Sequence, residues 1–208
     1  MAKRRVACLV DGFNIYHAIH ALRQNHLKWV DLRGVASEFV NPFQEELAEV
    51  FYFSAYATWL PGPYRRHRQY VAALQSRDVT AVMSPFKVRP KRCQKCGHQW
   101  DEHEEKETDV QIAIYLMRNA FQRSFGKVLL ISADSDLTPA VEMARSVAPE
   151  VPIHLLVPPG RWNQAHGLQV AASSASRIKR HHLSKNLLPE KVIASGRTIV
   201  RPHEYDPP

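Results

Sequence analysis

Short apolar runs alternate with amphipathic stretches along most of the chain. One run, VACLV, covers residues 6–10 and stops at Asp11-Gly12, and another, KVLLI, covers residues 127–131. Continuous apolar runs of this length are typical of strands buried on both faces of a parallel sheet. The same reasoning predicts strands at 49–58 and 151–157, an extended outer segment at 79–88, and a last strand or basic strip at 177–183.

Helical periodicity separates these predicted strands. The clearest helix is predicted at 105–123, where Ile112, Leu116 and Ala120 share an apolar stripe and acidic residues crowd the first turns. Shorter helices are predicted at 15–23 (with Asn14 as its N-cap), 32–40, 64–76, 137–148 and 163–172. Alternating strands and helices indicate an α/β fold with a mostly parallel central sheet covered by helices on both faces. In such a fold the functional site lies at the carboxyl ends of the strands.

Composition and charge favour a folded protein that binds a polyanion. The 208 residues are 45% hydrophobic and 23% charged, which excludes a wholly disordered chain. The formal net charge of +8 makes nucleic acid the first candidate partner and an anionic membrane surface the second. No apolar run approaches the ~18 residues that a membrane span needs, and the run at 6–10 is too short for an export signal. We therefore expect a cytoplasmic protein that does not enter a membrane.

Four aspartates fall where the fold predicts its site. Asp11 directly follows the first strand, Asp134 and Asp136 follow the strand at 127–131, and Asp109 shares the inward stripe of the long helix. Carboxylates that meet at one sheet edge repel one another unless a cation lies between them. Oxygen ligands select Mg²⁺ or Mn²⁺ over zinc, so the sequence predicts a site for one of these ions.

Each aspartate also has a purely structural interpretation. Asp11 is suited to a turn before Gly12, Asp134 to a loop, Asp136 to the N-cap of the next helix, and Asp109 to the positive end of its own helix. All four interpretations would have to hold together by coincidence, so we favour the metal site. A nucleotide-dependent oxidoreductase is disfavoured, because the turn after the first strand lacks the G-x-G-x-x-G pattern.

Three segments resemble the signature segments of NYN-domain proteins, the LabA-like branch of the PIN-like nuclease superfamily. They are VDGFN at 10–14, EKETDV at 105–110 and ISADSDL at 131–137, in the family's order and spacing. The resemblance spans residues 5–183. It implies a PIN-like three-layer α/β/α sandwich, which we place at residues 1–184. Residues 185–208 are polar and contain prolines, so we expect them to form a loose tail. The resemblance also implies metal-dependent cleavage of RNA, a ribonuclease activity.

The resemblance also implies roles for individual residues. Asp11, Asp109 and Asp134 match the family's acidic metal-binding positions, Asp136 a fourth acid of the cluster, and Asn14 the asparagine that orients a ligand or the scissile phosphate. One departure is residue 133, an alanine where glycine is more usual. Several family members are better known as regulators, so a catalytically inactive RNA- or protein-binding regulator is the alternative.

A polar insertion at 89–104 carries a candidate zinc site. Thiolates and imidazoles at short spacing suit tetrahedral Zn²⁺. The four candidate ligands lie within eleven residues: Cys93, Cys96, His98 and His103. The alternatives are a flexible basic loop with two free thiols, a redox C-x-x-C pair, and a His103 that faces the aspartates instead.

The same insertion contributes most of the predicted RNA-binding strip, which leads into the helix that carries Asp109. The residues of this strip are Lys87, Arg89, Lys91, Arg92 and Lys95, with Lys106 beside the aspartates as a further candidate. Two other basic runs, at 65–68 and 177–185, offer similar charge. Such runs bind phosphate when they meet nucleic acid and are otherwise solvated surface. The oligomeric state is left open, with a homo-oligomer among the alternatives.

Overall fold

A six-stranded, fully parallel sheet forms the centre of the computed structural model, which describes residues 2–105, 107–194 and 196–208. The strand order is β3-β2-β1-β6-β7-β8. The bounds are β1 (Arg4–Asp11), β2 (Glu45–Ala55), β3 (Val79–Ser84), β6 (Lys127–Ile131), β7 (Ile153–Val157) and β8 (Ser174–Arg177). The chain runs outward from β1 to β3 and then returns to the other side of β1, so the strand order reverses between β1 and β6. That reversal is the position where ligands bind in open α/β sheets.

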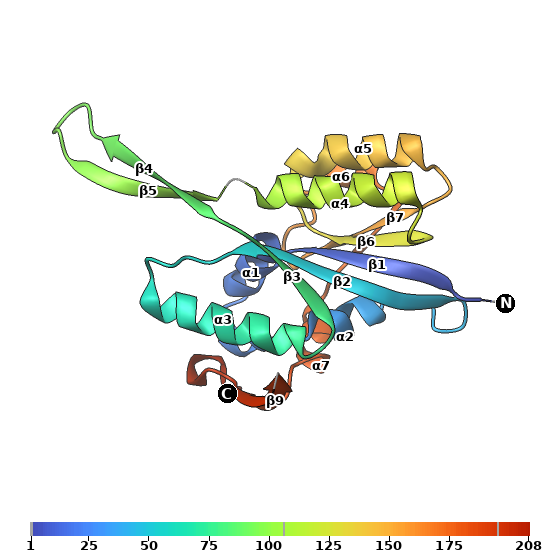
Figure 1. Ribbon diagram of the computed structural model, residues 1–208, viewed down its shortest axis with the longest axis horizontal. Coiled ribbons are helices and arrows are strands. Elements are labelled where there is room, and N and C mark those ends of the chain that lie inside the picture. The colour runs from blue at the N-terminus through green and yellow to red at the C-terminus, as the bar shows by residue number, and fades with distance from the viewer. Residues whose placement is uncertain (1, 106, 195) are drawn as a thin grey trace.

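Helices cover both faces of this sheet (Figure 1). One face carries α1 (Gly12–Ala21), α2 (Leu32–Ser37), α3 (Pro61–Gln75) and α7 (Arg180–Lys185), and the other carries α4 (Thr108–Gln122), α5 (Thr138–Val147) and α6 (His166–Ala171). Alternate residues of β1 serve the two cores: Val6, Cys8 and Val10 pack on the α1 side, and Ala7 and Leu9 on the α4 side. The predicted three-layer α/β/α sandwich is confirmed. No helix in the described part of the chain is long and apolar enough to cross a membrane.

Two helix starts differ from the prediction. The N-cap of α1 is Asp11 rather than Asn14, because the Asp11 side chain accepts a hydrogen bond from the Asn14 backbone. Helix α3 begins at Pro61, three residues early, since a proline in the first turn forfeits no helical hydrogen bond. The predicted strand or strip at 177–183 is also wrong in part, because β8 ends at Arg177 and α7 follows.

An antiparallel hairpin, which we call the arm, projects from the sandwich (Figure 1). It comprises β4 (Phe86–Arg92) and β5 (Gln99–Glu105), which form a separate two-stranded sheet. Aromatic contacts hold its base: the Phe86 ring meets Trp59 edge-on at 4.6 Å, and His103 stacks on Trp59 at 3.7 Å. The polar insertion predicted at 89–104 is therefore an ordered hairpin.

The C-terminal segment packs on the domain, so the predicted loose tail is wrong. It forms a second hairpin, β9 (Lys191–Ala194) with β10 (Arg197–Val200), and a short 3₁₀ turn, η3 (His203–Tyr205). Leu188, Val192 and Tyr205 are buried, and the Trp29 indole donates a hydrogen bond to the Pro189 carbonyl at 2.8 Å. A few apolar side chains spaced through a polar segment are enough to hold it here.

Candidate metal centre

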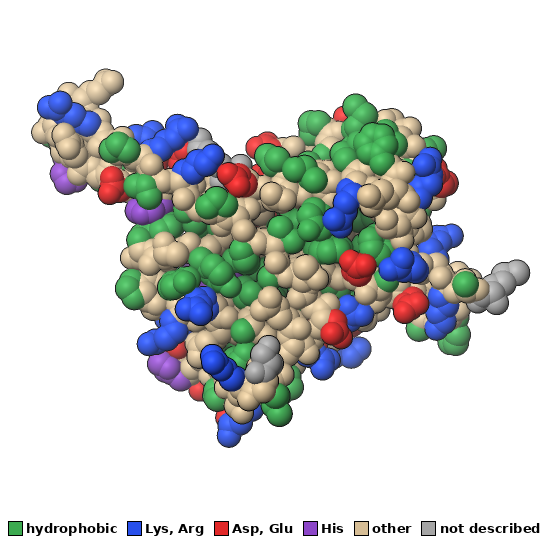
Figure 2. Space-filling view, in the orientation of Figure 1, with side chains coloured by type: hydrophobic (Ala, Val, Ile, Leu, Met, Phe, Trp, Pro, Cys, Tyr) green, Lys and Arg blue, Asp and Glu red, His purple; other side chains and the backbone are tan. Residues whose placement is uncertain are grey.

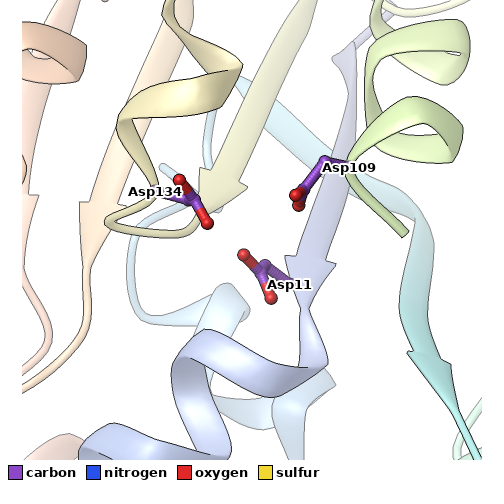
Figure 3. A group of neighbouring side chains, drawn as sticks. All are labelled: Asp11, Asp109 and Asp134. Atoms are coloured by element: carbon purple, nitrogen blue, oxygen red, sulfur yellow. The ribbon is translucent and has the colours of Figure 1, made fainter. Parts of the chain in front are cut away.

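Three carboxylates meet at the reversal of strand order. Asp11 ends β1, Asp109 lies in the first turn of α4, and Asp134 follows β6. One carboxylate oxygen from each lies within 4.8 Å of the other two, and Figure 3 shows the three side chains pointing toward one another. We call this group the Asp triad. It joins acids that are up to 123 residues apart in the chain, as the strand-end reasoning predicted.

Hydrogen bonds fix the Asp11 carboxylate in place. Its Oδ1 accepts from the Asn14 backbone N–H at 3.0 Å, and its Oδ2 accepts from the Asn14 side-chain amide at 2.9 Å and from the Ser132 hydroxyl at 2.8 Å. The Asn14 Oδ1 in turn accepts from the Ala133 N–H at 3.2 Å. Asn14 therefore ties the turn after β1 to the turn after β6, which is a positioning role.

The turn after β6 presents Asp134. The backbone N–H of Asp134 donates to the Ser132 hydroxyl at 3.0 Å, and its Oδ1 accepts from the Asp136 N–H at 3.1 Å. Ala133, the departure from the family pattern, does not have a positive φ, so its methyl group introduces no backbone strain. Ser132 was not singled out from the sequence, although a small hydroxyl between a strand and an acid is a signal for this type of turn.

Asp136 is not a member of the Asp triad. It lies exposed in the 3₁₀ turn η2 (Ser135–Leu137), and the N-cap of that turn is Asp134. Its negative charge nonetheless contributes to the raised pKa of Asp109. The predicted fourth acid is thus at the rim of the site, and the alternative that it caps α5 is wrong as well.

The site destabilises the ionised form of its own acids. Burial, the largest cause, and the charges of Asp11, Asp134 and Glu105 together raise the pKa of Asp109 to about 6. Burial also raises the pKa of Asp11, against the opposing effect of its hydrogen bonds from Asn14 and Ser132. A divalent cation would relieve this repulsion, and three hard carboxylate oxygens are the donor set that Mg²⁺ or Mn²⁺ prefers. The residues present therefore fit a divalent cation.

Glu105 supports the triad from the start of α4. Its Oε1 accepts from the backbone N–H groups of Glu107 at 2.9 Å and Thr108 at 2.7 Å. These bonds fix the first turn of the helix, where Asp109 lies. Glu105 is predicted inside the helix, whereas it precedes α4, because the run of acidic residues hides where the helix begins.

The predicted RNA-binding strip lies on the arm, where acidic residues of the partner strand face it. Three basic side chains of β4 form ion pairs with carboxylates that are offset from their register partners: Lys87 with Glu107 at 3.5 Å, Arg89 with Glu104 at 3.3 Å and Lys91 with Glu102 at 3.1 Å. Figure 2 shows the two signs of charge along the arm. Arg92 and Lys95 are exposed near its tip, with no ion pair to a described residue, and Lys106 lies outside the described residues.

The four candidate zinc ligands do not gather. Across the described residues the Asp triad is the one group of three or more potential ligands that lie within 4.8 Å of one another. His103 stacks on Trp59 at the base of the arm and so faces neither the thiols nor the triad. Cys93 and Cys96 are free thiols in the tight turn at the tip, where Gly97 has a φ of +72°. The four-ligand zinc site is therefore a wrong prediction.

A comparison with protein families identifies the family to which this chain belongs. The NYN domain model matches residues 5–174. The chain belongs to the NYN domain family. NYN domains are part of the PIN-like nuclease superfamily, so nuclease chemistry at the Asp triad is the activity that membership suggests in general terms. The match ends at β8, which leaves α7 and the C-terminal hairpin outside the NYN domain model.

A solved structure supports the fold of this NYN domain. The crystal structure of VPA0982, a protein of unknown function from Vibrio parahaemolyticus RIMD 2210633, is similar with a TM-score of 0.59 and 20% sequence identity. The similarity covers 86% of this chain and 94% of that one. No protein of curated function matches the chain significantly. The comparisons therefore establish family and fold, and the LabA-like branch stays a prediction.

Proposed function

We propose that this NYN domain is a divalent-metal-dependent ribonuclease that hydrolyses phosphodiester bonds at the Asp triad. The observation that supports this most strongly is the convergence of Asp11, Asp109 and Asp134 from three separate elements to within 4.8 Å. The raised pKa of Asp109 is consistent with a site that is complete only with a cation. Mg²⁺ and Mn²⁺ are the proposed ions, because every donor of the triad is a carboxylate oxygen.

The chain's own residues hold and orient the reacting groups. When bound, a divalent cation would lower the pKa of an attacking water and stabilise the charge that develops on the phosphate and the leaving oxygen. Asp11 is held rigid by Asn14 and Ser132, so its carboxylate needs no reorganisation during the reaction. Asp109 on α4 and Asp134 after β6 complete the carboxylate set, and no serine, cysteine or histidine nucleophile is needed.

RNA as the substrate rests on family membership together with charge. The net charge of +8 favours a polyanion, and the superfamily favours RNA. Within the proposed RNA-binding strip, Arg92 and Lys95 are available without rearrangement. Lys87, Arg89 and Lys91 would have to exchange a carboxylate partner for a phosphate. This exchange reduces the free energy that each contributes to RNA binding.

A cleavage assay tests the proposal. Purified protein is incubated with single-stranded and structured RNA in Mg²⁺ or Mn²⁺, with and without EDTA, and RNA binding is measured in parallel. We expect metal-dependent cutting that Asp11→Asn and Asp109→Asn abolish while binding persists. Asp78→Asn, an exposed change in the turn before β3, is the matched control and should cut normally.

Two results would count against the proposal. Cutting that survives both triad substitutions would refute the site assignment. Wild-type protein that binds RNA in every metal condition without cutting it would favour the catalytically inactive regulator.

A further inference from the structure

A cavity on the α1 and α3 side of the sheet takes no part in the proposed hydrolysis. It has a volume of about 340 Å³ and lies between α1, α3 and the end of β2. Gly12 and Phe13, the two residues that directly follow Asp11, form part of its wall. Consecutive Cα atoms are about 3.8 Å apart, so the cavity begins within two residues of the triad. The wall of this cavity is therefore continuous with the chain that carries Asp11.

Aromatic rings make the walls. Tyr52 meets His67 edge-on at 86° and Tyr70 at 88°, each with ring centroids 6.1 Å apart. The Tyr52 hydroxyl and the His67 Nε2 lie 3.1 Å apart, and the Tyr70 hydroxyl donates to the Val30 carbonyl at 2.9 Å. These bonds hold the rings in place without a ligand. A preformed apolar cavity of this size with aromatic walls suits one planar ring system.

A close backbone approach creates this arrangement. A Cβ atom at Gly12 would lie 2.6 Å from the Phe53 carbonyl oxygen and 2.8 Å from the Tyr52 ring. Any larger residue would push the end of β1 away from β2 and displace Tyr52. Glycine after Asp11 thus serves the cavity as well as the turn.

The cavity also carries a cation suited to a phosphate. Lys28 lines it, with its Nζ 3.0 Å from the His20 Nδ1 and 5.1 Å from the centre of the Tyr16 ring. No carboxylate of the described residues forms an ion pair with Lys28, whereas the nearby Arg66 is paired with Glu204 at 2.8 Å. An uncharged apolar ligand would form no ion pair with this ammonium group. Aromatic walls with a cation that lacks a carboxylate partner among the described residues suit a base that carries a phosphate.

One wall comes from outside the NYN domain model. Tyr205 lines the cavity from the 3₁₀ turn η3, which the salt bridge between Arg66 and Glu204 holds against α3. The family match ends at residue 174. This wall is therefore a feature of the present chain that family membership does not supply.

We propose that this cavity binds one unpaired nucleobase of the nucleic acid whose backbone reaches the Asp triad, with Lys28 contacting an adjacent phosphate. The proposal rests on the proposed function and specifies its substrate: a strand with at least one unstacked base beside the scissile bond. Base pairing would prevent the base from entering, so the cavity selects single-stranded or looped nucleic acid.

Binding of mononucleotides in EDTA tests the cavity without relying on cleavage. Uridine and adenosine 5′-monophosphates are titrated into the full chain and followed by NMR, with ribose 5-phosphate as the probe that lacks a base. We expect both nucleotides to bind about tenfold more tightly than ribose 5-phosphate, because base–aromatic stacking supplies the difference. Equal binding of all three probes would overturn the proposal and leave only phosphate binding at the rim.

Variants separate the cavity from the triad. Tyr205→Ala removes one wall, and Ala57→Phe fills the cavity while leaving the C-terminal segment intact. Both should weaken nucleotide binding about tenfold, whereas the exposed α4 change Phe121→Ala should not. Unchanged binding in Ala57→Phe would overturn the proposal. Nucleotide binding by a protein that never cuts RNA would support the cavity and refute only the proposed hydrolysis.

Discussion

Asp109 is the residue at which burial and like charge act together most clearly. Its pKa is raised to about 6, so the folded protein favours its neutral form. A group with a raised pKa contributes stability that is fully present below its unfolded pKa and is lost as the pH rises through the folded pKa. For Asp109 in the metal-free protein this loss occurs between pH ~4 and pH ~6.

Asp109→Asn should consequently stabilise the metal-free protein. The amide reproduces the neutral carboxyl group and removes the repulsion from Asp11 and Asp134. We expect an increase on the order of 1 kcal/mol in the free energy of unfolding at pH 7.5, after allowing for solvent screening of a half-buried group. Thermal unfolding in EDTA measures it. The gain should disappear below pH ~4, and a variant less stable than wild type at pH 7.5 would contradict the electrostatic account.

Single residues were predictable where one rule places the side chain. Asp11 and Asp134 follow directly from the carboxyl ends of β1 and β6, and Asp109 from its place on an inward stripe. Ser132 and Glu105 were missed, because their roles are hydrogen bonds that depend on where a turn closes and where a helix begins. Such boundaries shift by one or two residues without any change in the hydrophobic pattern.

The structure changes the interpretation of the charges on the arm more than on any other element. Phe86, Val88 and Pro90 alternate with basic residues in β4, but β5 is polar apart from Trp100, so no alternation of apolar positions marks the second strand. Pairing in register sets a basic strand against an acidic one, and cross-strand ion pairs support the hairpin. Counting cations along the sequence therefore overestimates the positive charge that this element offers to a partner.

Tip residues of the arm should matter more for RNA affinity than the paired residues of β4. Two double variants are compared. The tip variant carries Arg92→Ser and Lys95→Ser, and the matched control carries Arg89→Ser and Lys91→Ser. Each phosphate contact to a single strand contributes about 0.7 to the slope of log affinity against log salt, so the tip variant should lower the slope by about 1.4. Fluorescence anisotropy at several salt concentrations measures this slope. A larger loss in the Arg89 and Lys91 variant would mean that the salt bridges open on binding.

At the scale of the whole molecule, the parallel sheet and its two helical layers were predictable and the C-terminal packing was not. Five apolar runs and the helices between them predict the sandwich, because burial on both faces demands continuous apolar strands. Residues 185–208 offer only apolar runs of two or three residues, such as those at 187–188 and 192–194, between polar residues. The burial of Val192 and Tyr205 depends on a surface formed by η1 (Asn25–Trp29) and α3, which no local pattern reveals.

Removal of residues 187–208 should destabilise the entire domain. The truncation uncovers Trp29, which is fully buried, and deletes the Pro189 carbonyl that accepts its indole hydrogen bond. It also removes the buried side chains of Leu188, Val192 and Tyr205, each worth about 1.5–3 kcal/mol of burial. We expect a large drop in melting temperature and faster proteolysis. A truncated protein as stable as the full chain would show that this segment does not pack as described.

Manganese binding tests the central claim most directly, since it asks whether the Asp triad holds a hard divalent cation at all. Mn²⁺ is titrated into wild-type protein at pH 7.5 and followed by electron paramagnetic resonance of the free ion, beside Asp11→Asn, Asp109→Asn, Asp134→Asn and the control Asp78→Asn. Saturable binding is predicted for the wild type and the control, with affinity lowered at least about tenfold in each triad variant because each loses one charged ligand. Equal Mn²⁺ binding by the wild type and all three triad variants would contradict the account.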